Sequence, residues 1–375
     1  SAFQSSPSPN VYSWNFLLLA YGHKGHLDKA WELFCDMPTR NIVSWNLMIG
    51  SCSDNGCAKE ALCVFHHMFI EGPQPDTITF VSALNACVRL TSVTHETNDE
   101  YKDADPQACQ YNVDLRKGGS PSVQRSYFTN SNYAGHVKAN HTLWNQHMVL
   151  EEAHMMHTAI VGMGYEQDGF IGNALTNVYG KCQSVASGLS VFHRATNRDV
   201  VTWTAMIASF SQNDYTEEAL TLFKRMLSEG VIPNNVTFAC ALDACGSLAS
   251  IKDGEYIHAS IVEYGGLHTD PLVGNALVSL YGKCKRVHRA ESVFVKMHSR
   301  DAVSWNTMIS TFSQNGCASE ALGLFEHMLM EGLKPDKITL ICAVDACAGL
   351  RDMVEGLKLH DLVVMAGYEH LEVVG

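Results

Sequence analysis

Apolar residues recur at helical spacing in two short series between residues 302 and 336. Members of each series lie three or four positions apart, which places their side chains on one face of an α-helix. Gly316 separates the series and predicts a turn, because glycine adopts a positive φ at no steric cost. Pro335 follows the second series, so the stretch predicts a helical hairpin whose first helix covers about residues 304–313. The first face carries Trp305, Met308, Ile309 and Phe312, and the second carries Ala321, Leu322, Leu324, Phe325, Met328 and Leu329.

The same hairpin pattern recurs along the chain. Residues 42–76 and 200–234 repeat the order of apolar and polar positions found in 302–336. A single hairpin cannot bury the apolar faces of both its helices, so such hairpins must stack on one another. The pattern therefore predicts an array of helical repeats, in which function depends on residues that occupy the same place in each repeat.

Nine repeats account for residues 11–371, and their lengths follow a short, standard, long order three times. The short repeats have 31 residues, the standard repeats have 35, and two of the long repeats have 36 and 35. A period matched three times is a specific signal of a repeat array. The repeats are 11–41, 42–76, 77–168, 169–199, 200–234, 235–270, 271–301, 302–336 and 337–371.

The third repeat contains an insertion. Residues 91–147 have no counterpart in the other long repeats, and only seven of these 57 residues are Leu, Ile, Val or Phe. That is too few to form a core, so we expect the insertion to be disordered. Two explanations stay open: a retained intron, since 57 codons keep the reading frame, and a functional inserted loop. The expected organisation is a leader fragment (1–10), repeats (11–90), the insertion (91–147), further repeats (148–371) and a tail fragment (372–375).

Composition and charge narrow the classes of partner. Hydrophobic residues make up 46% of the chain and charged residues 17%, which is typical of a folded protein. The chain has no run of 18 apolar residues, so no membrane span is expected. The formal net charge of −13 disfavours nonspecific binding to phosphate backbones. Neither a membrane nor DNA is therefore an expected partner.

Cysteine and histidine do not form a metal-binding or catalytic pattern. The thirteen cysteines include no CxxC, and several occupy equivalent places in different repeats, which predicts buried thiols in a reducing compartment. Several histidines recur in the same way and are predicted to pack rather than to bind metal. No phosphate loop, dinucleotide fingerprint or Ser-His-Asp order is present, so we expect no cofactor and no enzymatic activity. The equivalent residues of the long repeats are Cys87, Cys245 and Cys347, and His157, His258 and His360.

The repeat sequences resemble a known family. Residues 302–336 contain SWNTMI, NGCASEALGLF and EGLKPD, while 171–182 (IGNALTNVYGKC) and 273–284 (VGNALVSLYGKC) match each other closely. Over residues 11–371 the chain is similar to plant pentatricopeptide repeat proteins of the class that alternates standard, long and short repeats. The resemblance implies an all-α, right-handed superhelical solenoid of helix-turn-helix repeats. Its concave face would hold single-stranded RNA, about one base per repeat.

The fifth and the closing residue of each repeat are the candidate base-reading positions that the resemblance implies. The fifth residue is polar in the short and standard repeats but apolar in the long ones, where it is Val81, Ala239 or Ile341. An asparagine side chain both donates and accepts hydrogen bonds, whereas an aspartate only accepts. Helix capping alone would explain the closing Asp but not an asparagine inside the helix. The predicted pairs are Asn15 with Asn41, Asn46 with Asp76, Asn173 with Asp199, Thr204 with Asn234, Asn275 with Asp301, and Asn306 with Asp336.

The resemblance also implies which bases these pairs select. The first pair would favour a pyrimidine, the four Asn–Asp pairs uracil, and Thr204 with Asn234 adenine. The expected RNA therefore reads Y-U-x-U-A-x-U-U-x from its 5′ end. The second residue of each repeat would wedge between bases, although ordinary packing explains an apolar residue there equally well. The candidate wedging residues are Val43, Val201 and Val303, with the less typical Tyr12, Phe170 and Leu272.

The expected function is sequence-specific binding of single-stranded RNA in an organelle, as a specificity factor for RNA processing, most of all C-to-U editing. A DYW deaminase domain is not expected in this chain, because the HxE of His370 and Glu372 is followed by no CxxC. Any deaminase would act in trans or be supplied by a missing carboxyl end. Accessory editing proteins would dock on the long repeats. A mitochondrion or a plastid is implied, with the mitochondrion favoured. Candidate phosphate contacts, or else solvated surface residues, are Lys181, Lys283, Lys285 and Arg286.

The alternative is a protein-interaction scaffold similar to tetratricopeptide arrays. The acidic charge and the apolar fifth residues of the long repeats favour that alternative. The regular Asn and Asp residues of the short and standard repeats oppose it.

Overall fold

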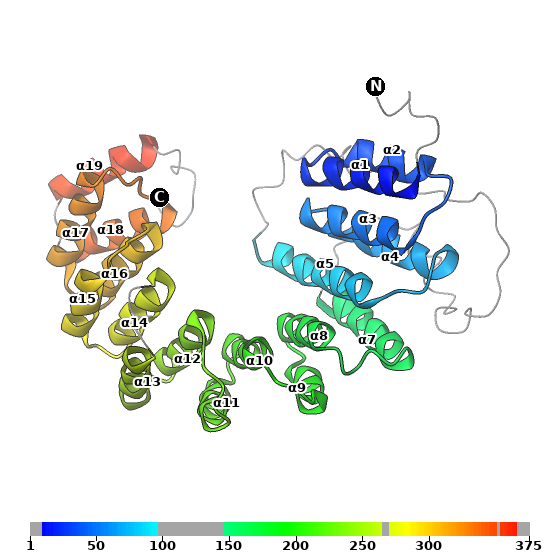
Figure 1. The fold of residues 1–375 in the computed structure, drawn as a ribbon. Coiled ribbons are helices and arrows are strands. Elements are labelled where there is room, and N and C mark those ends of the chain that lie inside the picture. The colour runs from blue at the N-terminus through cyan, green and yellow to red at the C-terminus, as the bar shows by residue number, and fades with distance from the viewer. Residues whose placement is uncertain (1–9, 97–145, 265–269, 351–352, 366–375) are drawn as a thin grey trace. The chain divides into compact units, whose positions relative to one another are not determined.

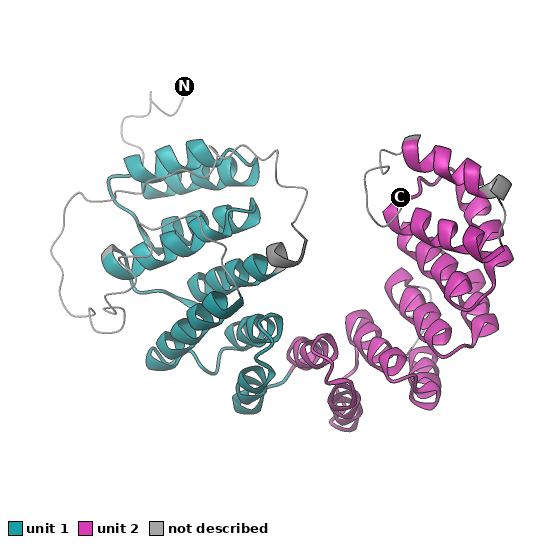
Figure 2. Ribbon diagram, turned by 180° about the vertical axis from the view of Figure 1, so that it is seen from behind, with its two compact units in different colours: residues 1–198 teal, residues 199–375 magenta. Residues whose placement is uncertain are grey.

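The structure is a computed structural model that describes residues 10–96, 146–264, 270–350 and 353–365 (Figure 1). Within these residues it contains 18 α-helices and no strand, which confirms the predicted all-α fold of helical hairpins. None of the helices in these ranges is both long and apolar enough to span a membrane. The helices form two compact units, residues 1–198 and 199–375, which are coloured separately in Figure 2.

Each helix pair of the first compact unit corresponds to one predicted repeat. Its helices are α1 (Val11–His23), α2 (Leu27–Asp36), α3 (Ile42–Asp54), α4 (Ala58–Glu71), α5 (Thr77–Glu96), α7 (Gln146–Gly162), α8 (Gly169–Lys181) and α9 (Val185–Arg194).

The second compact unit continues the same order of paired helices. Its helices are α10 (Val200–Gln212), α11 (Thr216–Ser228), α12 (Asn235–Ser247), α13 (Ile251–Glu263), α14 (Pro271–Lys283), α15 (Val287–Lys296), α16 (Ala302–Gln314), α17 (Ala318–Met330), α18 (Lys337–Leu350) and α19 (Met353–Met365).

The first helix of a repeat begins where the closing residue of the preceding repeat caps it. Asp301 accepts a hydrogen bond from the Ser304 backbone N–H at 2.8 Å and so satisfies a donor that has no partner inside α16. The cap explains why α16 begins at Ala302, two residues before the predicted start. After the first helix, Gly316 adopts a φ of 75°, which confirms the predicted turn.

Within each compact unit the repeats stack helix on helix. First helices contact the first helices of adjacent repeats, in the order α1, α3, α5, α8 and in the order α10, α12, α14, α16, α18. In two standard repeats the tryptophan packs against the second helix of the repeat before it. Trp45 lies edge-on to Phe34 with ring centroids 5.0 Å apart, and Trp305 meets Phe294 in the same way at 5.3 Å. Burying such a side chain contributes about 1.5–3 kcal/mol, so each repeat depends on its neighbour.

Several predicted segments lie wholly or mostly outside the described residues. The leader 1–10 is described only at Asn10, and the tail 372–375 not at all. Most of the insertion 91–147 is likewise outside these ranges, so its predicted disorder stays a prediction. The described parts of the insertion are helical, because α5 extends to Glu96 and α7 begins at Gln146.

Candidate nucleic-acid interface

Three of the predicted base-reading pairs are joined by direct hydrogen bonds. In each pair the fifth residue lies inside a first helix, and the closing residue caps the first helix of the next repeat. The stacking of first helices therefore brings together side chains that are 26 or 30 positions apart in the sequence. The bonds run from Asn15 Nδ2 to Asn41 Oδ1 (3.2 Å), from Asn46 Nδ2 to Asp76 Oδ1 (3.0 Å) and from Asn306 Nδ2 to Asp336 Oδ2 (2.8 Å).

Asp76 and Asp336, which close two standard repeats, are held in their charged form. Burial acts to raise the pKa of Asp76, but the hydrogen bonds donated by the Thr79 backbone, the Asn46 amide and the Thr79 hydroxyl outweigh it and hold the pKa below its usual value. The pKa of Asp336 is lowered by the same balance of burial and hydrogen bonds. A deprotonated carboxylate can only accept hydrogen bonds. It therefore attracts the N–H of the neighbouring asparagine and not its carbonyl oxygen.

The other predicted pairs differ in detail. The Thr204 hydroxyl lies 2.6 Å from the Val200 carbonyl oxygen and 2.6 Å from Thr237 Oγ1. Thr237 Oγ1 in turn lies 2.9 Å from Asn234 Oδ1, so Thr204 reaches Asn234 only through a third residue. Asn173 and Asp199 belong to different compact units.

In the seventh repeat the asparagine is only partly satisfied. Burial acts to raise the pKa of Asp301, but hydrogen bonds from the Ser304 backbone and hydroxyl and from the Asn275 amide hold it below its usual value. The Ser304 hydroxyl lies 2.8 Å from Asp301 Oδ1. Asn275 Oδ1 is buried and has no hydrogen-bond partner among the described residues. This site therefore leaves one acceptor of the asparagine unused.

The second residue of every repeat is an exposed apolar side chain. The six candidate wedging residues are between 47% and 81% exposed. Three further residues, in the long repeats, occupy the same place, and the recurrence of an apolar residue at the second position along the sequence is the signal that could have identified them. Nine apolar side chains thus lie on the surface, each three positions before a fifth residue. The three additional residues are Ile78, Val236 and Ile338.

The long repeats use their closing aspartates differently. Thr77 Oγ1 donates to Asp168 Oδ2 at 2.9 Å, and Asn235 Nδ2 donates to Asp270 Oδ2 at 2.6 Å. In both cases the donor is the first residue of the long repeat and not the fifth. Sequence reasoning missed this arrangement because it compared the same two positions in every repeat. Three short and standard repeats thus pair their closing residue with their fifth residue, whereas two long repeats pair it with their first residue.

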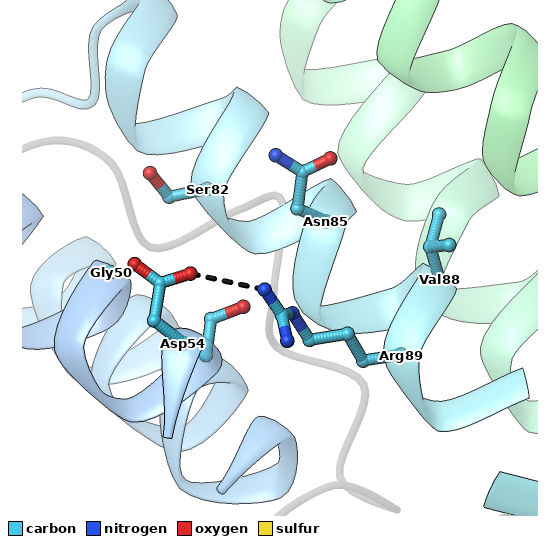
Figure 3. A pocket seen from close by; sticks show the side chains of 7 residues that line it. Gly50, Asp54, Ser82, Asn85, Val88 and Arg89 are labelled. Carbon is cyan, nitrogen blue, oxygen red and sulfur yellow. Dashed lines mark hydrogen bonds and ion pairs between the residues drawn. The ribbon is translucent and has the colours of Figure 1, made fainter. Parts of the chain in front are cut away.

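Two basic side chains on the first helices are paired with aspartates. Arg89 lies 3.1 Å from Asp54 and joins α5 to α3 beside a cavity of about 310 Å³, which Figure 3 shows with Ser82 and Asn85. Arg89 was not among the candidate phosphate contacts. One of the candidates, Lys283, lies 3.1 Å from Asp243. These pairs leave little net positive charge at the two places.

The repeated histidines and cysteines contribute mainly to packing. His157 Nδ1 lies 2.8 Å from the Tyr179 hydroxyl, and His258 Nδ1 lies 2.7 Å from that of Tyr281. These contacts confirm the predicted packing role of two histidines, but the prediction is wrong for His360, which is exposed. The three equivalent cysteines are buried, and every described cysteine is a free thiol. Among the described residues no group of three His, Cys, Asp or Glu is placed to hold a metal ion.

Models of the pentatricopeptide repeat match most of the repeats. The model described as the PPR repeat family matches residues 9–43, 40–89, 198–247 and 300–349, and that described as the PPR repeat matches 275–301.

Curated relatives are pentatricopeptide repeat-containing proteins of Arabidopsis thaliana. One is 31% identical over 89% of this chain and 38% of its own length. A chloroplastic relative is 31% identical over 96% of this chain and 38% of its own length. A mitochondrial relative is 39% identical over 53% of this chain and 31% of its own length. The chain thus spans less than half the length of these relatives.

Solved structures share the fold. The crystal structure of the pentatricopeptide repeat protein PPR10 from maize has a TM-score of 0.50 and 18% identity, covering 98% of this chain and 55% of its own. PPR10 in complex with an 18-nt psaJ RNA element has a TM-score of 0.52 and 19% identity, covering 98% and 57%. At this identity the likeness is evidence of the helical-repeat fold alone.

Proposed function

The chain belongs to the pentatricopeptide repeat family, and from that premise we propose that it binds single-stranded RNA in a sequence-specific manner. The observation that carries the proposal is the regular set of bonded polar pairs. In three repeats the fifth side chain bonds to the closing side chain, which caps the first helix of the next repeat. The fifth residue also lies three positions after an exposed apolar residue. A flat base can contact the apolar side chain through its face while its polar edge meets the pair. That PPR10 has been solved with an RNA element bound supports the same reading.

The mechanism assigns different tasks to the two kinds of residue. The closing aspartate, charged at neutral pH, orients the asparagine amide, and the amide supplies the hydrogen bond to the base edge. Val43, Val201 and Val303 separate successive bases, as do the other second residues. Because the chain carries a net charge of −13 and Arg89 and Lys283 are paired, base contacts and not phosphate attraction supply the affinity.

The finer parts of the proposal concern the whole protein. The short, standard, long order of the repeats supports membership of the class that alternates these lengths. Its role would be that of a specificity factor for C-to-U editing, with a deaminase acting in trans. Accessory editing proteins would dock on the long repeats, whose pairs are built differently. Relatives named chloroplastic or mitochondrial support an organelle, and we favour the mitochondrion. The chain itself would bind RNA and not catalyse a reaction.

A binding titration tests the proposal. The 375-residue chain is titrated at fixed salt against the RNA YUNUANUUN, with binding followed by fluorescence anisotropy. The comparison RNA has G in place of U at the eighth base, which Asn306 and Asp336 are expected to read. We expect at least tenfold tighter binding of the matched RNA, and the double variant Asn306→Ser with Asp336→Asn should shift this preference. If the folded chain binds neither RNA, the proposal is wrong and the protein-scaffold alternative is favoured.

A further inference from the structure

A buried hydroxyl contacts both members of a base-reading pair. Thr79 has no exposed surface, and its Oγ1 lies 2.6 Å from Asn46 Oδ1 and 2.9 Å from Asp76 Oδ1. Thr79 is the third residue of the repeat that follows Asn46, so it comes from the neighbouring first helix, α5. The hydroxyl, the amide and the carboxylate thus form a closed group of three.

A group of three side chains with the same arrangement forms at two other pairs, although at Asn15 the closing residue Asn41 supplies an amide in place of the carboxylate. Each is made by the third residue of the following repeat, and each of these residues is buried. Ser44 Oγ lies 2.7 Å from Asn15 Oδ1 and 3.0 Å from Asn41 Oδ1, and Thr339 Oγ1 bonds to Asn306 Oδ1 and lies 2.9 Å from Asp336 Oδ1.

Counting protons fixes the orientation of the asparagine amide in this group. The Thr79 hydroxyl has one proton, and Asn46 Oδ1 is the nearer of its two acceptors. The Asp76 carboxylate receives N–H donors from Thr79 at 2.9 Å and from Asn46 at 3.0 Å. If the Asn46 amide were turned over, its carbonyl oxygen would face the Asp76 carboxylate, and two acceptors would meet. The hydrogen bond from the Thr79 hydroxyl to the amide oxygen would also be lost. The amide therefore keeps its carbonyl toward Thr79, and its second N–H is left for a ligand.

The register of the repeats separates this role from ordinary helix capping. All six polar fifth residues are followed by Ser or Thr at the third place of the next repeat. The apolar fifth residues Val81 and Ala239 are followed there by Ile171 and Val273. The helices that begin beside Ile171 and Val273 are nevertheless capped, by Asp168 and Asp270. A helix cap therefore does not need a hydroxyl at the third place. A hydroxyl is found there where the preceding repeat has a polar fifth residue.

We propose that the third-place hydroxyl is a positioning residue that makes the asparagine present an N–H, and so selects uracil over cytosine. The two pyrimidines differ at C4, where uracil carries a hydrogen-bond acceptor and cytosine a donating amino group. A fixed N–H can donate to the acceptor of uracil, whereas it meets another donor on cytosine. The inference rests on the proposed RNA binding and adds to it the residue that sets the pyrimidine preference.

The test exchanges the hydroxyl for a methyl group at one pair while another pair serves as the internal control. The probes are YUNUANUUN and two versions of it with C at the second or at the eighth base, titrated at fixed salt. Thr339→Val should lower the preference for U over C at the eighth base about tenfold, the effect of one hydrogen bond, and leave the second base unchanged. Thr79→Val should do the reverse, and Thr339→Ser should keep the preference. In the unaltered chain, the preference for U over C should be weaker at the seventh base than at the eighth. The reason is that Asn275 Oδ1 has no hydrogen-bond partner among the described residues, so no hydroxyl fixes this amide.

The results distinguish failure of this inference from failure of the proposed function. If the unaltered chain binds none of the probes, the proposed RNA binding is overturned, and the inference with it. If the unaltered chain prefers U but both Val variants keep that preference, the hydroxyl does not set it. Equal losses at both bases in each variant would show a general structural effect and would also overturn the inference. Circular dichroism of each variant establishes that it is folded.

Discussion

Loss of a histidine that pairs with a buried glutamate should destabilise the first compact unit far more than loss of the equivalent lysine destabilises the second. His66 Nε2 lies 2.7 Å from Glu152 Oε1, and the Glu152 side chain has no exposed surface. Lys224 occupies the same place in a standard repeat as His66, and its partner Asp253 occupies the same place in a long repeat as Glu152. The Lys224–Asp253 pair is 2.8 Å long, but its side chains are 54% and 32% exposed. The two pairs therefore differ chiefly in burial.

Burial sets the expected magnitudes. In His66→Ala the Glu152 carboxyl group loses the imidazole without gaining water, and breaking a buried pair in this way costs about 3–5 kcal/mol. In Lys224→Ala the Asp253 carboxylate is hydrated instead, so the cost should be about 0–1 kcal/mol. The double variant His66→Leu with Glu152→Leu removes both polar groups and should recover most of the loss, because an apolar pair of similar volume needs no partner.

The assay is urea unfolding combined with hydrogen exchange. Hydrogen exchange in α4 and α7 reports on the histidine variant, and exchange in α11 and α13 reports on the lysine variant. Local readouts are needed because a repeat array need not unfold in one step. Equal costs for the two single variants, or a double variant as unstable as His66→Ala, would refute the reasoning that burial makes Glu152 depend on His66.

Two further predictions concern packing between adjacent helices. Burial holds the pKa of His157 below its ordinary value of 6.5, and the charges of Arg194 and His154 lower it further. The unfolded chain therefore binds this proton more readily than the folded chain does. The free energy of unfolding should consequently fall as pH drops below about 6.5. Unfolding curves between about pH 5 and pH 8 should show this slope, and its persistence in His157→Gln would contradict the assignment. Gly254→Ala should cost about 1–3 kcal/mol, since the new Cβ would lie 2.5 Å from Leu280 Cδ2, whereas Gly323→Ala, with nothing within 4 Å, should stabilise by about 0.5–1 kcal/mol. Thermal melts that rank the two variants the other way would contradict this packing.

The sequence by itself determined the helices and the repeats. Apolar spacing, the closing Asp or Asn and turn residues such as Gly316 act within a few positions of one another, so helix type and repeat boundaries follow from local chemistry. The predicted start of α16 lay two residues inside the true one because the extent of a cap depends on the geometry around Asp301. The sequence also indicated which polar positions recur.

Only the tertiary structure decided which recurring residues meet. Thr79 and Asn46 are 33 positions apart, and their contact depends on how α3 and α5 stack, which no local pattern specifies. The bond between Thr77 and Asp168 spans 91 positions, and it distinguishes the long repeats by a residue that the sequence did not single out. The burial of Glu152 depends likewise on which helices cover it. Local propensity fixes the elements of such a chain, whereas hydrogen bonds between stacked helices are fixed by their packing, which is a property of the whole array.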